Sequence, residues 1–477
     1  MQIASMHFKA RAHDRLNDAQ LQFNMRKMKG KFVGLRRAAI VELDDFEGTR
    51  DAGQAIRQRV LADLDTWLAI FEENAAARGA TVLYARTPDD VNALVLAIAK
   101  RHGVRKVIKS KSMVSEESAL DHAIEGAGLK VVETDLGEYI LQINGYEPPS
   151  HLIGPALHKS KEEVSELFAR THGTPRKDVI EDLCLEARSV LREHYLTADM
   201  GISGGNFFVA ETGSVVLVTN EGNATLTTTL PRVHVAISGI EKVVPTLEDV
   251  ATLMRLLPRS ATGQSISNYV DVLTGVKGDG EFHGAEHMYF IVVDAGRSGV
   301  LASDVREALQ CIRCGACMNH CPVYQNIGGH SYGWVYPGPI GSVLTPMYIG
   351  LENAPDLPQA STLCNQCGVV CPVKIPLPDL LRKLREKEFE RGLRPWTERA
   401  GLRVWAWLAQ RPRLYAAATR LGARVLRSRR GPNGAIRQLP FAGGWTEGRD
   451  LPAPAGRTFR ELYAARRTSP PSDGASR

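Results

Sequence analysis

The sequence lacks any apolar run of the length that a membrane span needs, roughly 20 consecutive residues. The most apolar stretch near the end of the chain, residues 404–409, is far shorter. The first residues, MQIASMHFKARAHDRLND, carry charges throughout and lack the apolar core of a secretory signal. These two absences predict a cytoplasmic protein.

The sequence also lacks the fingerprints of nucleotide cofactors. No G-x-G-x-x-G opens a helix after a strand, and there is no P-loop. A flavin or nicotinamide site is therefore not indicated.

Lysine is absent from residues 391–477, although this segment carries 18 arginines against five acidic residues. Its formal charge of +13 leaves −7 for residues 1–390, because the whole chain has +6. Such a basic segment could bind an acidic partner subunit, an anionic membrane surface or nucleic acid. The alternative is an appendage that is simply solvated. Its aromatic residues recur at near-helical spacing, which favours an amphipathic helix packed on a partner over a base-stacking platform: Trp396, Trp405, Trp407 and Tyr415. We expect no nucleic acid, and we consider peripheral attachment to the inner membrane.

Cysteine is scarce and unevenly placed. Only eight cysteines occur in 477 residues, and seven of them lie between positions 311 and 371. In a chain without a secretory signal, clustered cysteines indicate a metal centre rather than disulfides. The eighth, Cys184, lies in a helical pattern among apolar neighbours, which predicts a buried small hydrophobe.

Hydrophobic periodicity predicts strands that alternate with helices between residues 70 and 300. Helical patterns cover 52–77, 89–102, 116–128, 159–193 and 247–257, and strand patterns cover 81–85, 106–109, 129–133, 214–219, 233–238 and 288–294. The first of these strands, 81–85 (TVLYA), is expected to be buried. This alternation implies an α/β fold with a largely parallel sheet. We predict an N-terminal helical segment (1–69), an α/β domain (70–300), a helical cysteine-rich domain (301–392) and a basic helical region (393–477) with a disordered end.

The first cysteine motif is Cys311-x2-Cys314-x2-Cys317-x3-Cys321-Pro322. This is the bacterial ferredoxin pattern for a [4Fe–4S] cluster, in which the fourth cysteine binds the other of two clusters. Zinc is the alternative, because paired Cys-x2-Cys motifs also bind zinc. Zinc leaves the third and fourth cysteines and the proline unexplained, so the spacing favours iron–sulfur.

The second motif, Cys364-x2-Cys367-x3-Cys371-Pro372, matches the last three cysteines of the same pattern. Pairing the motifs gives one cluster on Cys311, Cys314, Cys317 and Cys371. The other cluster has only Cys321, Cys364 and Cys367.

A complete second motif would have its first cysteine at position 361, where the sequence has serine. Three structures follow for the second cluster. The first is a [4Fe–4S] cluster with a non-cysteine fourth ligand, for which Ser361 and His320 are nearest in sequence. The second is a [3Fe–4S] cluster, which needs only three thiolates. The third is a [4Fe–4S] cluster with one iron open to water or substrate. The alternative for Ser361 is an ordinary loop serine, and for His320 it is solvation or a hydrogen bond to a cluster sulfur.

These motifs, together with two segments of the α/β region, resemble the lactate utilization protein B family. The segments are Lys109-Ser-Lys-Ser-Met113 and Gly204-Gly-Asn-Phe-Phe-Val-Ala-Glu-Thr-Gly-Ser-Val-Val-Leu-Val-Thr-Asn-Glu-Gly-Asn223, and Cys371-Pro-Val-Lys-Ile-Pro-Leu377 fits as well. The resemblance covers nearly the whole chain, from about residue 20 to the arginine-rich end.

The resemblance implies a LUD domain, similar to the sugar-isomerase and CoA-transferase type of fold, followed by a ferredoxin-like domain with two [4Fe–4S] clusters. It also implies electron transport during oxidation of L-lactate to pyruvate, together with two sister subunits. The family pattern has the same seven cysteines, so the resemblance implies the same division of ligands between the clusters.

Four residues of the α/β region are candidates for ligand binding. Lys109 and Lys111 lie at the end of a strand, where ligands bind in open α/β sheets, and two cations there suit a carboxylate or phosphate. Asn206 and Glu211 lie in turns that allow close backbone approach. The alternatives are exposed lysines and a turn carboxylate that faces water.

Three functions fit these observations. The first is an electron-transfer subunit, since two adjoining clusters carry single electrons. The second is a stand-alone enzyme that uses the incompletely ligated cluster as a Lewis acid for a hydroxy acid. The third is a binding module that docks through its arginine-rich end.

Overall fold

The structure of the chain is a computed structural model that describes residues 3–439, 443–446 and 449–468. The chain divides into two compact units, Met1–Arg391 and Gly392–Arg477. Residues 469–477, where a disordered end was expected, lie outside the described residues. The divisions predicted inside the first unit, at residues 69 and 300, stay predictions.

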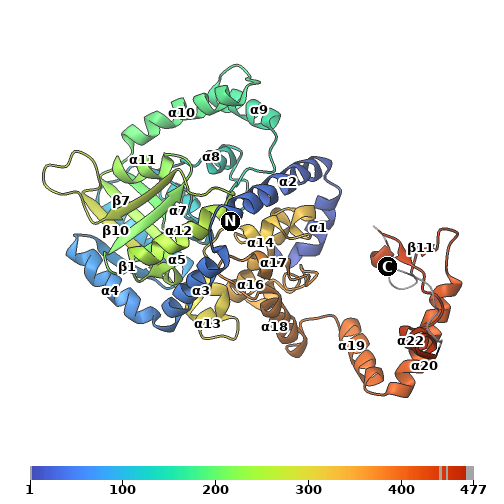
Figure 1. The fold of residues 1–477 in the computed structure, drawn as a ribbon. Coiled ribbons are helices and arrows are strands. Elements are labelled where there is room, and N and C mark those ends of the chain that lie inside the picture. The colour runs from blue at the N-terminus through green and yellow to red at the C-terminus, as the bar shows by residue number, and fades with distance from the viewer. Residues whose placement is uncertain (1–2, 440–442, 447–448, 469–477) are drawn as a thin grey trace. The chain divides into compact units, whose positions relative to one another are not determined.

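A six-stranded parallel sheet forms the centre of the first unit (Figure 1). Its order is β1-β10-β7-β4-β2-β3, and the strands are Thr81–Ala85, His287–Val293, Val233–Gly239, Met200–Gly204, Lys106–Lys109 and Lys130–Glu133, in that order. The register pairs Ile202 of β4 with Val235 of β7, and Val235 with Tyr289 of β10. All the pairs are parallel, which confirms the predicted α/β fold with a parallel sheet.

Alternate residues of the central strands face two different cores. Val235 and Ile291 pack with helices α5 (Pro88–Arg101) and α7 (Leu120–Gly126) on one face. Ala236 and Phe290 pack on the other face with α4 (Leu64–Ala77) and with a second sheet. Both faces are therefore covered, as a parallel sheet requires.

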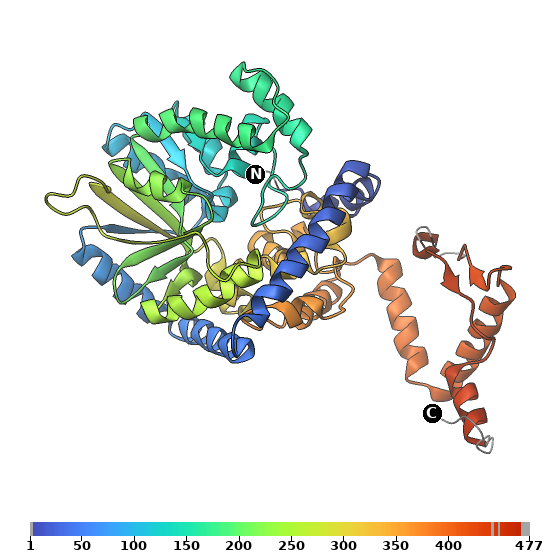
Figure 2. The ribbon, with the colours of Figure 1, turned by 45° about the horizontal axis from the view of Figure 1, so that its top comes forward.

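The second sheet has the order β8-β5-β6-β9, with strands Val243–Val244, Phe207–Val209, Ser214–Thr219 and Tyr269–Thr274. A third core lies at the β3 edge of the main sheet, against α8 (Leu136–Ile143), α9 (Lys161–His172) and α10 (Ile180–Thr197). Between β6 and β7 lies α11 (Asn223–Thr229), and α6 (Met113–Glu117) follows β2. The helices α9 and α10 are visible at the top of both views (Figures 1 and 2).

The N-terminal helices pack on the cysteine-rich region, far away in sequence. The helices α1 (Phe8–Leu16) and α2 (Ala19–Val41) lie against α15 (Tyr324–Ile327). Both α2 and α3 (Phe46–Ala62) also contact α12 (Leu247–Ala261). The cysteine region is built from short elements: α13 (Arg297–Leu301), α14 (Ala316–Asn319), α15, α16 (Gly338–Ile349), α17 (Gln366–Val370) and α18 (Leu377–Glu390), with 3-10 turns at Arg306–Gln310, His330–Tyr332 and Leu351–Asn353.

The second unit is mainly helical, with α19 (Trp396–Ala409), α20 (Pro412–Ser428), α21 (Gly443–Thr446) and α22 (Phe459–Thr468). Two short strands, Ala435–Ile436 and Leu451–Pro452, pair antiparallel. Neither α19 nor α20 buries a residue. Within the described parts of the chain, every helix is too short or too polar to cross a membrane.

Two of the expected helices are each divided in two. The helix expected over 116–128 is divided into α6 and α7 at Ala119, which has a left-handed φ of 51°. The helix expected over 159–193 is divided into α9 and α10, since α9 ends before Gly173, whose φ is 68°.

Three further details of the sequence prediction were wrong. The helix expected over 52–77 is interrupted at Asp63, whose φ of −128° and ψ of 43° end α3 before α4 begins. The strand 81–85 was expected to be buried, but β1 is an edge strand with Tyr84 46% exposed. Cys184 was expected to be buried and is exposed, because the buried face of α10 contains its neighbour Leu183, with Ala187 and Leu191.

Candidate metal centre

The seven clustered cysteines form two adjoining sets. Four of them line a single cavity whose other walls are mainly apolar, among them Leu152 and Ile340; the four are Cys311, Cys314, Cys317 and Cys371. Burial raises the pKa of Cys314 to about 12, and the nearby Cys371 thiolate acts in the same direction. These four sulfurs therefore share one enclosed space, although they come from loops some 50 residues apart.

The other three cysteines lie together beside this cavity. Burial raises the pKa of Cys367 to about 12, and the Cys321 and Cys364 thiolates act in the same direction. The pKa of Cys317 is raised by burial and also by thiolates of both sets, including Cys367. Cys317 thus lies where the two sets meet. Thiols that are this deeply buried stay protonated unless a metal binds them.

The two cysteine loops repeat one backbone geometry at an offset of 50 residues. Arg313 has a φ of 61° and Leu363 a φ of 55°, while Gly315 has 72° and Asn365 has 64°. These are left-handed values that few non-glycine residues adopt. In the first loop the Arg313 amide donates to Cys311 Sγ (3.4 Å), and in the second the Leu363 amide donates to Ser361 Oγ (3.1 Å). Ser361 therefore takes the position of Cys311 in the second loop.

Cationic side chains donate to the backbone carbonyls beside the cysteines. Arg36 Nη2 donates to Val370 O (3.0 Å), and Arg50 Nη2 to Cys371 O (2.7 Å). Arg57 is fully buried, and its Nε donates to Gln310 O (3.2 Å). Lys242 Nζ donates to Cys311 O (2.6 Å). Helices α2 and α3 thus hold both loops in place and surround the first set with positive charge.

Sequence reasoning missed these four cations, although a signal for two of them was present. Arg50 and Arg57 are spaced by seven residues and fall on the same helical stripe as Gly53, Ile56 and Val60, all buried in α3. A charged residue on an apolar stripe is buried only when it is paired or hydrogen-bonded. The carbonyls beside the cysteines to which they donate lie more than 250 residues away and could not be read from the sequence.

The two sets differ in exposure. The cysteines of the first set are buried, apart from the half-buried Cys311. Cys364 is exposed, as are the residues around it from 362 to 366. His320, the other candidate ligand, hydrogen-bonds through Nδ1 to Ala316 O of its own helix (2.9 Å). The second set therefore reaches the surface at Cys364, whereas Cys321 and Cys367 are buried.

Lys109 is a structural charge rather than a ligand-binding one. Its side chain is 1% exposed, and its Nζ contacts carboxylates of Glu133 (2.7 Å), Glu116 (2.9 Å) and Asp121 (2.9 Å). Although burial acts against it, these carboxylates hold the pKa of Lys109 well above its ordinary value. The three carboxylates could together hold a metal ion, but the ammonium group already occupies the space between them.

The other three candidates for ligand binding do not all lie at one place. Lys111 and Asn206 line a cavity of about 350 Å³ at the carboxyl ends of β2, β4 and β7. Glu211 does not line this cavity; it is exposed, and its Oε1 accepts a hydrogen bond from the Leu247 amide at the start of α12. Only two of the four predicted residues are therefore placed to meet a common ligand.

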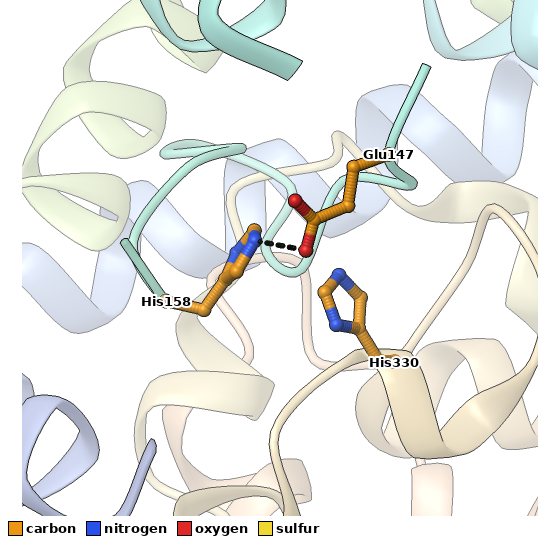
Figure 3. Close-up of side chains that lie close together, drawn as sticks. All are labelled: Glu147, His158 and His330. Carbon is orange, nitrogen blue, oxygen red and sulfur yellow. Dashed lines mark hydrogen bonds and ion pairs between the residues drawn. The ribbon is translucent and has the colours of Figure 1, made fainter. Parts of the chain in front are cut away.

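Figure 3 shows three side chains that point toward one another: Glu147, His158 and His330. Two histidines and one carboxylate are also the ligand set of a known type of metal site. His158 Nε2 lies 2.9 Å from Glu147 Oε1, and its Nδ1 lies 2.8 Å from Ser150 Oγ. Lys159 Nζ reaches the other carboxylate oxygen at 2.6 Å. Although burial acts against it, His158 and Lys159 hold the pKa of Glu147 well below its usual range. Lys159 thus supplies the positive charge that a metal would bring, so the group is a hydrogen-bonded cluster.

Models of three protein families match successive parts of the chain. The LUD domain matches residues 68–293, the 4Fe-4S dicluster domain matches residues 307–375, and the C-terminal part of lactate utilisation protein B matches residues 381–468. A protein from Bacillus pumilus named lactate utilization protein B is 43% identical over 98% of both chains. The chain belongs to the lactate utilization protein B family.

Other members of the lactate utilization protein B family agree over similar lengths. The protein of that name from Lysinibacillus sphaericus is 42% identical over 96% of this chain and 97% of its own. The protein from Anoxybacillus flavithermus is 44% identical over 90% and 92%. A solved structure of a DUF162 family protein from Deinococcus radiodurans covers 48% of this chain and 98% of its own at 16% identity, with a TM-score of 0.28.

The family matches bear on three of the predictions. They confirm the resemblance, and the LUD match confirms the predicted class of the α/β region. The dicluster match shows that the cysteine region is of an iron–sulfur type. The number and type of clusters, and the residues that bind them, stay predictions.

Proposed function

We propose that the chain is an electron-transfer subunit in the oxidation of L-lactate to pyruvate, with two [4Fe–4S] clusters as its carriers. The observation that carries this proposal is the arrangement of seven cysteines in two adjoining sets, in a chain of the lactate utilization protein B family. Such clusters accept and donate one electron at a time. Because a hydroxy acid gives up two electrons together, the lactate itself would react on a partner subunit.

Each cluster has a set of cysteines that fits it. Cys311, Cys314, Cys317 and Cys371 would hold the first, inside the cavity that they line. Cys321, Cys364 and Cys367 would hold three irons of the second. The amide groups that donate to sulfur support this assignment, from Arg313 to Cys311 (3.4 Å) and from Ile375 to Cys371 (3.3 Å), because such hydrogen bonds are part of iron–sulfur sites and tune their potentials.

Ser361 would be the fourth ligand of the second cluster. It occupies the position that Cys311 has in the first loop, with the same left-handed turn after it and the same amide hydrogen bond. A serine oxygen can bind iron once the metal has displaced its proton. We favour this arrangement over a [3Fe–4S] cluster and over an iron that is open to water.

Substitution of Ser361 tests the ligand. In Ser361→Ala we expect loss of one iron per chain and the EPR signal of an oxidised three-iron cluster. In Ser361→Cys we expect a complete cysteine set, the same iron content as the unaltered protein and a changed EPR spectrum for the second cluster. Thr362→Ala is the control, since this neighbouring hydroxyl is exposed and no repeat of the first loop assigns it a role. An unchanged iron count and spectrum in Ser361→Ala would rule out ligation.

The second unit would dock the protein on its partners. Its surface combines arginines with exposed apolar side chains of α19, among them Trp396 (77%), Trp405 (58%) and Trp407 (50%). An amphipathic face of this kind fits an acidic sister subunit or the anionic inner face of a membrane. The protein would then work in the cytoplasm, at the membrane surface.

Lactate oxidation tests the function as a whole. The purified chain alone, supplied with L-lactate and an artificial one-electron acceptor without oxygen, is expected to form no pyruvate. Addition of the sister subunits should restore pyruvate formation and reduce the clusters, and a chain that ends at Arg391 should assemble less well with them. Pyruvate formation by the purified chain alone would instead support a stand-alone enzyme that acts on the hydroxy acid at the second cluster.

A further inference from the structure

The cavity of about 350 Å³ lies where ligands bind in open parallel sheets. Its walls include the residues that follow β2 and β4, and the end of β7. From β2 the chain proceeds to β3, which is the neighbour of β2 on one side. It then crosses to β4 on the other side of β2 and continues to β7, so the direction in which strands are added reverses between β2 and β4. Ligand sites of doubly wound sheets occur at the carboxyl ends of the strands at such a point.

One wall of this cavity is the first cysteine loop. Ile312 and Arg313, which separate Cys311 from Cys314, both line it. Lys242 lines it as well, and its ammonium group donates to the Cys311 carbonyl. A ligand in the cavity would therefore contact the loop that carries two of the proposed cluster ligands.

Positively charged hydrogen-bond donors line the cavity. Arg313 Nη1 is buried and has no hydrogen-bond partner among the described residues, and Arg313 Nη2 comes no nearer than 3.5 Å to Glu241. Lys242 is 6% exposed and lines the cavity together with Arg313. Lys111 Nζ donates to Ile153 O (3.0 Å) and keeps further protons for a ligand. Unpartnered buried donors are costly, and an anion would relieve that cost.

The acidic residues of the cavity are already engaged. Glu241 Oε2 contacts Arg297 Nε at 2.9 Å, and this pair is buried. Asp135 Oδ1 accepts from the Glu138 amide (3.1 Å), and Glu221 Oε2 accepts from the Leu136 amide (3.3 Å). Each of these acidic residues thus has a partner for at least one carboxylate oxygen, whereas Arg313 Nη1 has none among the described residues.

Apolar side chains form much of the remaining wall, including Leu152, Ile237, Leu257 and Pro258. A volume of about 350 Å³ lies in the range of pockets that hold ligands of cofactor size. A bare inorganic ion would leave most of this wall uncovered. The occupant that fits has both an acidic group and an apolar body.

We propose that this cavity binds an organic anion with an apolar body, whose acidic group is held by Arg313, Lys111 and Lys242 next to the first cysteine set. The proposal deepens the proposed electron-transfer function and rests on it, because it gives the first cluster a small-molecule neighbour. The acidic group is a carboxylate or a phosphate, and the two sources are separated by experiment.

Titration calorimetry of the anaerobically purified holoprotein tests the proposal with four probes. Riboflavin 5′-phosphate provides a phosphate and a large apolar body, pyruvate and L-lactate provide a carboxylate on a small body, and inorganic phosphate provides no body. We expect at least one organic probe to bind once per chain with a Kd below about 1 mM and at least tenfold more tightly than inorganic phosphate. We also expect it to change the EPR spectrum of the first cluster.

Two variants locate the binding. Lys111→Met, at a cavity residue outside the cysteine loop, and Arg313→Gln should each weaken binding at least tenfold, while Arg59→Gln, at an exposed arginine that pairs with Asp249, should not. Iron content and reversible reduction are measured on the same samples. Absence of binding by all four probes, binding that survives both cavity variants, or equally tight inorganic phosphate would overturn the proposal. If the clusters are intact and reducible but no probe binds, the ligand proposal alone is wrong. If a probe binds but the clusters cannot be reduced reversibly, the proposed electron-transfer function is wrong.

Discussion

Arg36 is the residue whose charge bears most directly on the first cysteine set. It is 8% exposed, and it donates to Val370 O beside Cys371. Burial lowers the pKa of Arg36, and the Cys314 and Cys371 thiolates act in the opposite direction, so its guanidinium lies close to both. A fixed positive charge stabilises the reduced, more negative form of a cluster and raises its reduction potential.

We therefore predict that Arg36→Gln lowers the reduction potential of the first cluster by tens of millivolts, because the positive charge is removed while a hydrogen-bond donor is kept. Potentiometric titration followed by EPR measures this shift. Arg37→Gln is the matched control, since Arg37 is the next residue of the same helix and is exposed. Equal potentials in the two variants would show that Arg36 acts through packing alone.

At the residue scale, sequence reasoning was strong where a residue type determines its own chemistry. The cysteine spacing identified the iron–sulfur region, which the dicluster match supports. Reasoning was weaker for Lys109 and Glu211, because a position at a strand end or turn does not reveal which partner is folded against it. Lys109 is surrounded by carboxylates from β3, α6 and α7, and these neighbours depend on the tertiary fold.

At the scale of elements, Lys109 connects four of them. Its ammonium group joins β2 to Glu133 of β3, Glu116 of α6 and Asp121 of α7, all within 2.9 Å. Removal of the lysine would leave three carboxylates together without a counter-charge, and breaking such a buried group costs about 3–5 kcal/mol.

Lys109→Met is accordingly predicted to lower the free energy of unfolding by about 3–5 kcal/mol, as measured by urea denaturation. Lys106→Met on the same strand should change it by less than about 1 kcal/mol, because Lys106 is only half-buried and its ammonium bonds to the Thr197 hydroxyl rather than to a carboxylate cluster. A Lys109 variant as stable as the Lys106 variant would mean that the three carboxylates take up protons at little cost.

The elements themselves were predicted best where the pattern is long and regular. The helix 89–102 and the strands at 106–109, 214–219 and 233–238 occur within a residue of their predicted limits. Strand β4 was missed because its sequence, Met200–Gly204, contains two glycines. Gly201 is needed there, since a side-chain carbon at this position would lie 1.8 Å from Thr227 O of α11. Strand β8 has only two residues, which is too short for any periodic signal.

At the scale of the whole molecule, the N-terminal helices, the parallel sheet and the cysteine region belong to one compact unit. Arg57 joins the helices and the cysteine region to the second sheet, because it lies on α3 and donates to Leu309 O (3.1 Å) and Gln310 O (3.2 Å) before Cys311 and to Val243 O (3.3 Å) of β8. The cavity at the carboxyl ends of β2 and β4 faces the first cysteine loop. This arrangement gives the LUD domain a direct structural connection to the iron–sulfur region, which no motif in the sequence could reveal.

The most direct test of the central claim is a count of iron and acid-labile sulfide in the anaerobically purified chain, combined with EPR before and after reduction. Two [4Fe–4S] clusters predict about eight irons and eight sulfides per chain, and an EPR signal that appears on reduction and disappears on reoxidation. About seven irons would mean a three-iron second cluster and would contradict the role given to Ser361. Zinc in place of iron, four irons or fewer, or clusters that cannot be reduced reversibly would contradict the account as a whole.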